Sequence, residues 1–516
     1  MSSQNDDQLK SFLYNIIVLS GVSLGVGVRL LHLFRIPPGV PFRLGGLFYE
    51  FSQQILANGY RLPKNIPFYS QGGIPFAYPP LGFYVQAFII DVFTPDRFWT
   101  VNVLPPLVAS LGVLSYYFLL RKITNSRKVI IGALFAYALM PAAFTNQIEA
   151  AGLAEAFGTL ALIWYAFFLI SLEKRQRAFD VFGAGLLLGL SVVASPGSAL
   201  GGVTFSLLYA GKVLINRQYK LLRKFIMVGV IAFIISAPYW GNVIINHGVK
   251  IFSLPVSGQF NSVEGSSFIA RFLQSFFEFN YAGGDYAFIW NVLILIGLLW
   301  YFFKEKWFIP ILFFTLALIP REGVWITALV SPLLVGVALA DFALPLFEKG
   351  LAQISKKNLR LSLFTFIVLA FISSLIINTI LTIEEQINDD DWKISAVQID
   401  EIEKLREEIP PDAQILVIGN EALLEWTPQI IRREVINTHY GLEWQPDEYV
   451  TIIKINETIE EAQSWDDIFA VLRDNVDVEN VYILSDKDYL FRLEKGDVNL
   501  IDVTETSLFR VERFSK

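Results

Sequence analysis

The chain alternates long apolar stretches with short charged connections, and this pattern predicts a bundle of membrane-spanning helices. A spanning helix needs about 20 mostly apolar residues. Residues 156–172 form a slightly short apolar run between Glu155 and Glu173. Two longer stretches, 178–212 and 307–347, are interrupted by "SPGS" and "PREG". The remaining uncharged runs that predict spans are 11–28, 98–120, 129–148, 225–246, 286–303 and 361–382.

The positions of lysine and arginine predict how these helices cross the membrane. Short cytoplasmic loops are enriched in both residues. If the basic connections are all cytoplasmic, an even number of spans separates each pair, so 178–212 and 307–347 each form a helical hairpin. We therefore expect a multi-pass protein of the cell membrane with about 11 transmembrane helices, a cytoplasmic N-terminus and an extracytoplasmic C-terminal domain. The basic connections are 121–128, 173–177, 212–224, 304–306 and 348–360.

The first external loop, residues 35–97, contains a stretch that is apolar but rich in proline, glycine and aromatic residues, "PFYSQGGIPFAYPPLGFYVQAFII". Its uncharged core, residues 80–90, ends at Asp91 and is too short to span. That length is typical of an interfacial or re-entrant helix. Residues 46–58 also place their apolar side chains on one helical face, which predicts a helix lying on the membrane.

Composition supports a membrane part followed by a soluble domain. The chain is 54% hydrophobic and 17% charged. From Glu384 to the end there are 32 acidic and 13 basic residues, whereas the remainder has a net charge of +12. We expect a transmembrane domain over residues 1–384 and an extracytoplasmic α/β domain over 385–516. Neither part favours nucleic acid as a partner.

Within the acidic domain, short apolar runs predict strands and one amphipathic stretch predicts a helix. The predicted strands are 414–419 and 480–485, the predicted helix is 458–475, and residues 499–514 alternate as a strand or hairpin. No GxGxxG segment follows the first strand, so a nucleotide fingerprint is absent. The chain has no cysteine, and its three histidines share no tight spacing. The sequence therefore predicts neither disulfide chemistry nor a histidine-based metal site.

Several segments together resemble the GT-C superfamily of membrane glycosyltransferases. The resemblance covers most of the membrane part and is to the protein O-mannosyltransferase-like and 6-pyruvoyl-tetrahydropterin synthase-related membrane families. It implies a GT-C-like fold and transfer of a sugar from a polyprenyl-phosphate donor to a glycan or protein acceptor at the outer face of the membrane, with membrane lipid as a further partner. The segments are "ILANGYRLP" (55–63), "GGIPFAYPPLGFY" (72–84), 96–123, "SAPYW" (236–240) and "PREGVWITALVSPLL" (320–334).

This transfer needs a carboxylate that takes the proton of the acceptor. Relatives place an aspartate about 13 residues before the glycine of the "ILANG" turn, where this chain has Gly45 or Gly46. Glu50, one helical turn further on, is the nearest replacement, and a solvated surface position is its alternative. Glu149 and Glu155 flank the second external turn and are further catalytic candidates. Their alternative is an ordinary role at helix ends.

The departing phosphate needs positive charge from arginine, lysine or a divalent metal ion. Candidates that bind the substrate through charge are Arg43, Arg61, Lys64 and Arg321. Arg61 and Lys64 could instead contact lipid headgroups, and Arg321 could pair with the adjacent Glu322. Two tyrosines, Tyr69 and Tyr78, could stack on a sugar or belong simply to the aromatic belt of a membrane interface.

Three functions compete on the sequence alone. The first is a lipid-linked sugar transferase. The second is a non-catalytic GT-C relative that binds lipid or glycan, or scaffolds a partner, and the glycines at 45 and 46 favour it. A transporter or flippase ranks third, because the apolar runs hold almost no charge and internal repeats are not evident.

Overall fold

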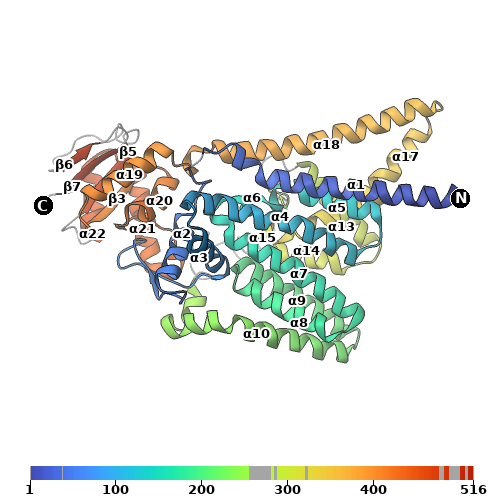
Figure 1. Ribbon diagram of the computed structural model, residues 1–516, viewed down its shortest axis with the longest axis horizontal. Helices are drawn as coiled ribbons and strands as arrows, with labels where there is room; N and C mark the ends of the chain where they lie inside the picture. The colour runs from blue at the N-terminus through green and yellow to red at the C-terminus, as the bar shows by residue number, and fades with distance from the viewer. Residues whose placement is uncertain are drawn as a thin grey trace.

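The structure is a computed structural model, and it describes residues 2–37, 39–254, 280–283, 288–319, 323–475, 481–486, 500–505 and 509–514. The molecule is elongated, with the N-terminus at one end and the C-terminal domain at the other (Figure 1). Helices α10 (Tyr219–His247) and α18 (Lys357–Asn388) run along opposite sides of the membrane bundle. The first loop lies between the bundle and the C-terminal domain.

Seven stretches of helix in the described part of the chain are long and apolar enough to cross a membrane. An eighth is formed if α5 (Arg127–Leu139) and the segment Pro141–Ile148, which meet at an angle of 84°, act as one span. Three more predicted spans fall on shorter helices, so the count of 11 stays a prediction. These are α8 (Ala178–Val192), α13 (Phe288–Phe303) and α14 (Phe308–Ala317). The long spans include α1 (Ser2–Leu30), α4 (Arg97–Ile123), α7 (Leu153–Arg175), α9 (Pro196–Ile215), α10 and α18, and the seventh joins α16 (Ser331–Val337), a π-helical turn and α17 (Leu344–Ala352).

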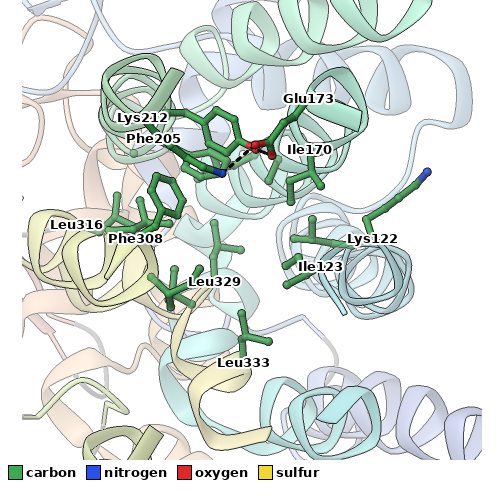
Figure 2. A pocket seen from close by; sticks show the side chains of 18 of the residues that line it. Lys122, Ile123, Ile170, Glu173, Phe205, Lys212, Phe308, Leu316, Leu329 and Leu333 are labelled. Carbon is green, nitrogen blue, oxygen red and sulfur yellow. Dashed lines mark hydrogen bonds and ion pairs between the residues drawn. The ribbon is translucent and has the colours of Figure 1, made fainter. Parts of the chain in front are cut away.

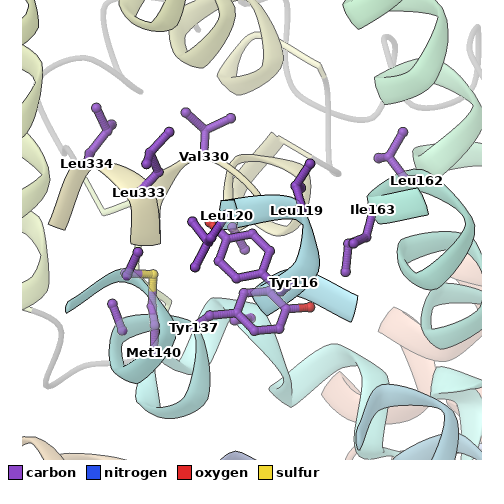
Figure 3. Packing of buried hydrophobic residues seen from close by; sticks show 14 of the residues in the cluster. Tyr116, Leu119, Leu120, Tyr137, Met140, Leu162, Ile163, Val330, Leu333 and Leu334 are labelled. Carbon is purple, nitrogen blue, oxygen red and sulfur yellow. The ribbon is translucent and has the colours of Figure 1, made fainter. Parts of the chain in front are cut away.

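The core of the bundle combines aromatic stacking with close helix contacts (Figure 3). Tyr116 and Tyr137 stack with ring centroids 4.1 Å apart, and the Tyr116 hydroxyl donates to the carbonyl of Leu329 at 2.9 Å. At the α5–α16 contact, a Cβ added to Gly132 would lie 3.1 Å from the Cα of Gly336. Small residues let helices approach closely where lipid gives no hydrophobic drive for association.

The first loop folds into two helices joined by a short hairpin. Its helices are α2 (Gly46–Ala57) and α3 (Leu81–Phe93), and its hairpin pairs β1 (Asn65–Ile66) with β2 (Ile74–Pro75). Aromatic rings from both helices and from the end of the hairpin form one cluster. In this cluster the ring centroid of Phe51 lies 4.9 Å from that of Phe83 and 5.0 Å from that of Phe76. A helix, α3, is present where the sequence predicts a non-spanning one, and that it does not cross the membrane stays a prediction. The predicted surface helix exists as α2, but it is covered by α3 and the C-terminal domain and does not lie open on a membrane surface.

The C-terminal domain has an α/β fold, as predicted. Its described strands form a sheet in the order β4-β3-β5-β7-β6, parallel at β4-β3-β5 and antiparallel beyond. The predicted hairpin over 499–514 is present as β6 and β7. The single helix predicted at 458–475 is wrong, because two helices meet there around Ser464. The elements are α19 (Ala396–Glu408), β3 (Gln414–Ile418), α20 (Glu421–Ile431), β4 (Glu434–Val435), α21 (Pro446–Glu461), α22 (Trp465–Asn475), β5 (Val481–Asp486), β6 (Leu500–Glu505) and β7 (Phe509–Phe514).

The first loop also closes one edge of this sheet. Tyr69 forms a parallel bridge with Val435, whose amide donates to the carbonyl of Phe68 at 2.9 Å, and the Ser70 amide donates back to Val435 at 3.3 Å. An open edge strand would present unpaired backbone groups. The loop thus ties the C-terminal domain to the helical bundle through main-chain hydrogen bonds.

Candidate functional site

The start of α2 holds a carboxylate that comes from the C-terminal domain. Oε2 of Glu425 accepts hydrogen bonds from the amides of Gly45 at 3.1 Å and Gly46 at 2.9 Å, and Oε1 accepts from Leu47 at 2.8 Å. The first amides of a helix have no partner within the helix and favour negative charge. Glu425 on α20 therefore caps α2 from another domain.

This contact leaves little space for a side chain at either glycine. A Cβ on Gly45 would lie 2.6 Å from the Cβ of Ala150, and a Cβ on Gly46 would lie 3.1 Å from Oε2 of Glu425. The neighbouring Trp426 donates its indole N–H to the carbonyl of Arg43 at 2.9 Å. An aspartate at position 45 consequently clashes with Ala150 in this conformation, and one at position 46 fits only if Trp426 or Glu425 shifts by a few tenths of an ångström.

Glu425 is 3% exposed. Burial raises the pKa of its carboxyl, and the hydrogen bonds from the three amides act in the opposite direction. The hydroxyl of Tyr69 donates to the main-chain carbonyl of Glu425 at 3.1 Å. Tyr69, a candidate for sugar stacking, is fully buried here and holds the loop against α20.

Glu50 is fully buried on α2. Gln54 donates to its Oε1 at 2.6 Å, and its Oε2 has no hydrogen-bond partner among the described residues. Burial raises the pKa of Glu50, while Gln54 and the charge of Arg432 oppose the rise. Glu50 has no exposed surface, so it does not reach an acceptor in this conformation.

Arg43 pairs with Glu149 rather than with Glu50. Its Nε lies 3.4 Å from Oε1 of Glu149, and its Nη2 lies 3.9 Å from Oδ2 of Asp389. Its guanidinium carbon stands 5.1 Å from the ring centroid of Trp392. Burial raises the pKa of Glu149, and Arg43 opposes that rise. This cluster joins the turn before α7 to the segment that leads into the C-terminal domain.

Glu155 lies in the first turn of α7, beside the turn between α8 and α9. Ser195 donates its hydroxyl to Oε1 of Glu155 at 2.6 Å. The adjacent Val193 accepts from the amide of Leu81 at 2.8 Å, which brings the start of α3 to the same place. Glu155 is partly exposed. It is therefore a partly exposed carboxylate next to the start of α3.

The remaining predicted residues are spread over the loop. Arg61 and Lys64 are exposed, and the carbonyl of Lys64 contacts the ring of His247 at 3.0 Å. Tyr78 is partly buried, and its ring centroid lies 5.9 Å from that of Trp444. Arg321 lies outside the described residues.

The structure thus joins Arg43 with Glu149, whereas Glu50 bonds to Gln54 and Glu155 bonds to Ser195. Three cavities of the described chain have volumes of about 240, 310 and 250 Å³, and none is lined by these residues. Among the described residues, no group of three or more His, Cys, Asp or Glu could hold a metal ion. These residues do not fit the divalent ion considered above.

Sequence reasoning missed Glu425. The signal was present, because Glu425 is the one charged residue within the apolar segment "ALLEWTPQII" at 422–431. A lone charge among apolar residues of an amphipathic helix is costly to bury unless it is hydrogen-bonded. Such a residue is a candidate for a specific polar contact, which here is the start of α2.

Comparisons with known proteins agree on one fold. Residues 77–241 match the family model of dolichyl-phosphate-mannose-protein mannosyltransferase. The oligosaccharyltransferase of Archaeoglobus fulgidus is similar with a TM-score of 0.61 and 14% identity, over 93% of this chain and 70% of that one. ArnT from Cupriavidus metallidurans, bound to undecaprenyl phosphate, is similar with a TM-score of 0.58 and 13% identity, over 97% of each chain.

The arabinofuranosyltransferase AftD from mycobacteria is similar with a TM-score of 0.54 and 12% identity, over 95% of this chain and 41% of that one. A comparison with curated proteins finds no match. All of these structures, and the matching family, are GT-C superfamily membrane glycosyltransferases. The chain therefore has the fold of the GT-C membrane glycosyltransferases, as the sequence resemblance predicted.

Proposed function

We propose that the protein is a membrane glycosyltransferase that transfers a sugar from a polyprenyl-phosphate donor to an acceptor at the outer face of the membrane. The observation that carries the proposal is the overlap with ArnT over 97% of both chains, in a structure that contains undecaprenyl phosphate. A second similar structure, archaeal AglB, is bound to a dolichol-phosphate and an inhibitory peptide. The match to a mannosyltransferase family model supports the same chemistry.

Glu155 is the general base in this proposal. It is partly exposed, stands beside the start of α3 and is held by the hydroxyl of Ser195. The acceptor atom bonds to the anomeric carbon of the sugar, and Glu155 takes the acceptor's proton. The bond from that carbon to the phosphate oxygen breaks, and polyprenyl phosphate leaves with the electron pair. Arg61 and Lys64, which are exposed on the first loop that also contains α3, supply positive charge for the phosphate.

The experiment compares transfer by wild type and Glu155→Gln in membrane vesicles supplied with radiolabelled polyprenyl-phosphate sugars. A general base contributes about 10²- to 10⁴-fold, so we expect a fall of at least about 100-fold. Glu348→Gln is the matched control, because Glu348 is an exposed carboxylate on α17, which lies at the end of the bundle opposite the C-terminal domain. Undiminished transfer by a folded Glu155→Gln variant would remove Glu155 from this role.

A second candidate function is a non-catalytic GT-C relative that binds lipid or glycan. The observation that favours it is the Glu425 carboxylate, which fills the start of α2 where relatives carry an aspartate. In that case wild type retains undecaprenyl phosphate in native mass spectrometry but transfers no sugar from any of the radiolabelled polyprenyl-phosphate sugars. Transfer by wild type rejects this candidate.

A further inference from the structure

An apolar cavity of about 240 Å³ lies inside the bundle at the end opposite the C-terminal domain. Helices α4, α7, α9 and α14 form its walls, together with residues of α15 (Gly323–Thr327) and α16. Figure 2 shows leucine, isoleucine and phenylalanine side chains around it, among them Ile170, Phe205 and Leu329. An apolar cavity of about 150 Å³ already holds benzene, so this one has room for part of a hydrocarbon chain.

The same cavity is lined at one end by three lysines and one glutamate. Nζ of Lys212 lies 2.8 Å from Oε1 of Glu173. The other carboxylate oxygen of Glu173, Oε2, accepts a hydrogen bond from the hydroxyl of Tyr209. Lys174 donates to the carbonyl of Lys122 at 2.5 Å. In Figure 2, Lys212 and Glu173 form a pair on one side, and Lys122 points outward on the other. Three ammonium groups against one carboxylate leave a net positive charge.

These lysines have hydrogen-bonding capacity to spare. Each ammonium carries three N–H donors, and Lys122 and Lys174 have no carboxylate partner among the ion pairs of the described residues. Nζ of Lys122 rests 4.7 Å from the ring centroid of Phe167. An anionic oxygen beside the Lys174–Lys122 contact would therefore meet donors from two helices, α4 and α7.

The positions of the charged residues along α7 and α9 show at which end of the bundle they lie. Phe205 and Lys212 are seven residues apart on α9, about 10 Å along the helix axis. Glu155 and Glu173 are 18 residues apart on α7, about 27 Å along the axis. The hydrocarbon core of a bilayer is about 30 Å thick. The cavity's charged end thus lies at the opposite membrane boundary from the proposed transfer site.

We propose that this cavity binds one acyl chain of an anionic phospholipid from the leaflet at that end, with the lipid phosphate against Lys122, Lys174 and Lys212. The charge complementarity selects an anionic headgroup, and the apolar walls select a hydrocarbon chain. The sugar donor does not fit as the occupant, because its phosphate must reach the other boundary, where Glu155 and α3 lie. The site is independent of the proposed transfer reaction.

The test uses the full chain, purified in detergent and incubated with phosphatidylglycerol or phosphatidylcholine of identical acyl chains, then examined by native mass spectrometry. We expect wild type to retain phosphatidylglycerol in preference to phosphatidylcholine. Lysine side chains near a membrane surface attract anionic lipid, so a triple alanine variant of Lys122, Lys174 and Lys212 should lose at least tenfold in retention. Lys220→Ala is the matched control, because Lys220 is exposed at the same end of the bundle and does not line the cavity.

A second variant fills the cavity without changing its charge. Ala166 lines the cavity, and Ala166→Leu should also reduce retention of phosphatidylglycerol. If the triple variant does not fold, this variant and Lys174→Ala decide the outcome. Equal retention of both lipids by wild type, or undiminished retention by the folded variants, overturns the proposal. Loss of transfer in Glu155→Gln has no bearing on these outcomes, so the two proposals fail separately.

Discussion

Replacing Glu425 with alanine should release the start of α2 from the C-terminal domain. Three backbone amides, those of Gly45, Gly46 and Leu47, donate to this one buried carboxylate. Alanine supplies no acceptor, so the amides lose their partners. The contact spans 380 residues of sequence between Gly45 and Glu425, and its loss should be felt in both segments.

The magnitude follows from the number of bonds. A hydrogen bond contributes about 1 kcal/mol net, so three contribute about 3 kcal/mol. Since each 1.4 kcal/mol is a factor of ten, the protection of these amides should fall by about 100-fold. Global stability is a poor measure here, because the variant also removes the cost of burying the carboxylate of Glu425, whose pKa burial raises. Local exchange isolates the contact itself.

Hydrogen–deuterium exchange of the purified chain, followed in peptides that cover residues 44–52, measures this protection. Glu421→Ala is the matched control: Glu421 lies one turn earlier on α20 and bonds to Tyr440 instead. We expect fast exchange at the start of α2 in Glu425→Ala and wild-type exchange in the control. Exchange within twofold of wild type in folded Glu425→Ala would refute the assignment of these bonds as the main link between α2 and α20.

Three further variants test other contacts. Arg29→Met should lower the thermal midpoint of the detergent-solubilised chain, because the Arg29 guanidinium donates to three carbonyls around the bend after α5 and to the carbonyl of Gly25 on its own helix. Arg29→Lys should recover part of the loss, and an unchanged midpoint in Arg29→Met would contradict the reasoning. Glu50→Gln should have a higher thermal midpoint than wild type at pH 7, because burial raises the folded-state pKa of Glu50 above its ordinary value of 4.5 and wild type loses stability as pH rises above that value. The difference between the two midpoints should shrink toward pH 4.5, and a difference that is equal at all pH values would disprove this reasoning. Gly46→Asp should loosen the contact between α2 and the C-terminal domain, because its Cβ alone would lie 3.1 Å from Oε2 of Glu425, and should therefore speed proteolysis of the connection between α18 and α19. Cleavage at the wild-type rate would show that the contact tolerates a second carboxylate.

Local patterns predicted local structure well. The short uncharged core at 80–90 predicted a short helix, and α3 has 13 residues. The alternation at 499–514 predicted the pair β6–β7. Both depend on periodicity and run length within one segment, which the sequence displays directly. The same method failed at 458–475, because the amphipathic pattern continues across the break between α21 and α22.

Contacts between distant segments were beyond that method. Arg43 precedes Glu50 by only seven residues, yet its partner is Glu149, which the fold brings from beyond α5. The number of spans was also underdetermined. Run length counts apolar residues, whereas a span also needs a continuous helix, and the segment after α14 is divided into α15, α16, a π-helical turn and α17.

Gly45, Gly46 and Glu425 are best understood as one feature. A side chain at position 46 and a carboxylate at 425 compete for the same space, since the Cβ would stand 3.1 Å from Oε2. An aspartate at position 45 would therefore clash with Ala150, and one at position 46 would crowd the carboxylate of Glu425 from the docked C-terminal domain. The amides at the start of α2 favour an anion, whether it comes from α2 itself or from the C-terminal domain. With glycine at positions 45 and 46, the carboxylate of Glu425 from the C-terminal domain accepts their hydrogen bonds. A carboxylate engaged by three amides has few lone pairs left for an acceptor's proton, and this leaves the base of the proposed transfer to a carboxylate outside the contact, for which Glu155 has both the exposure and the position.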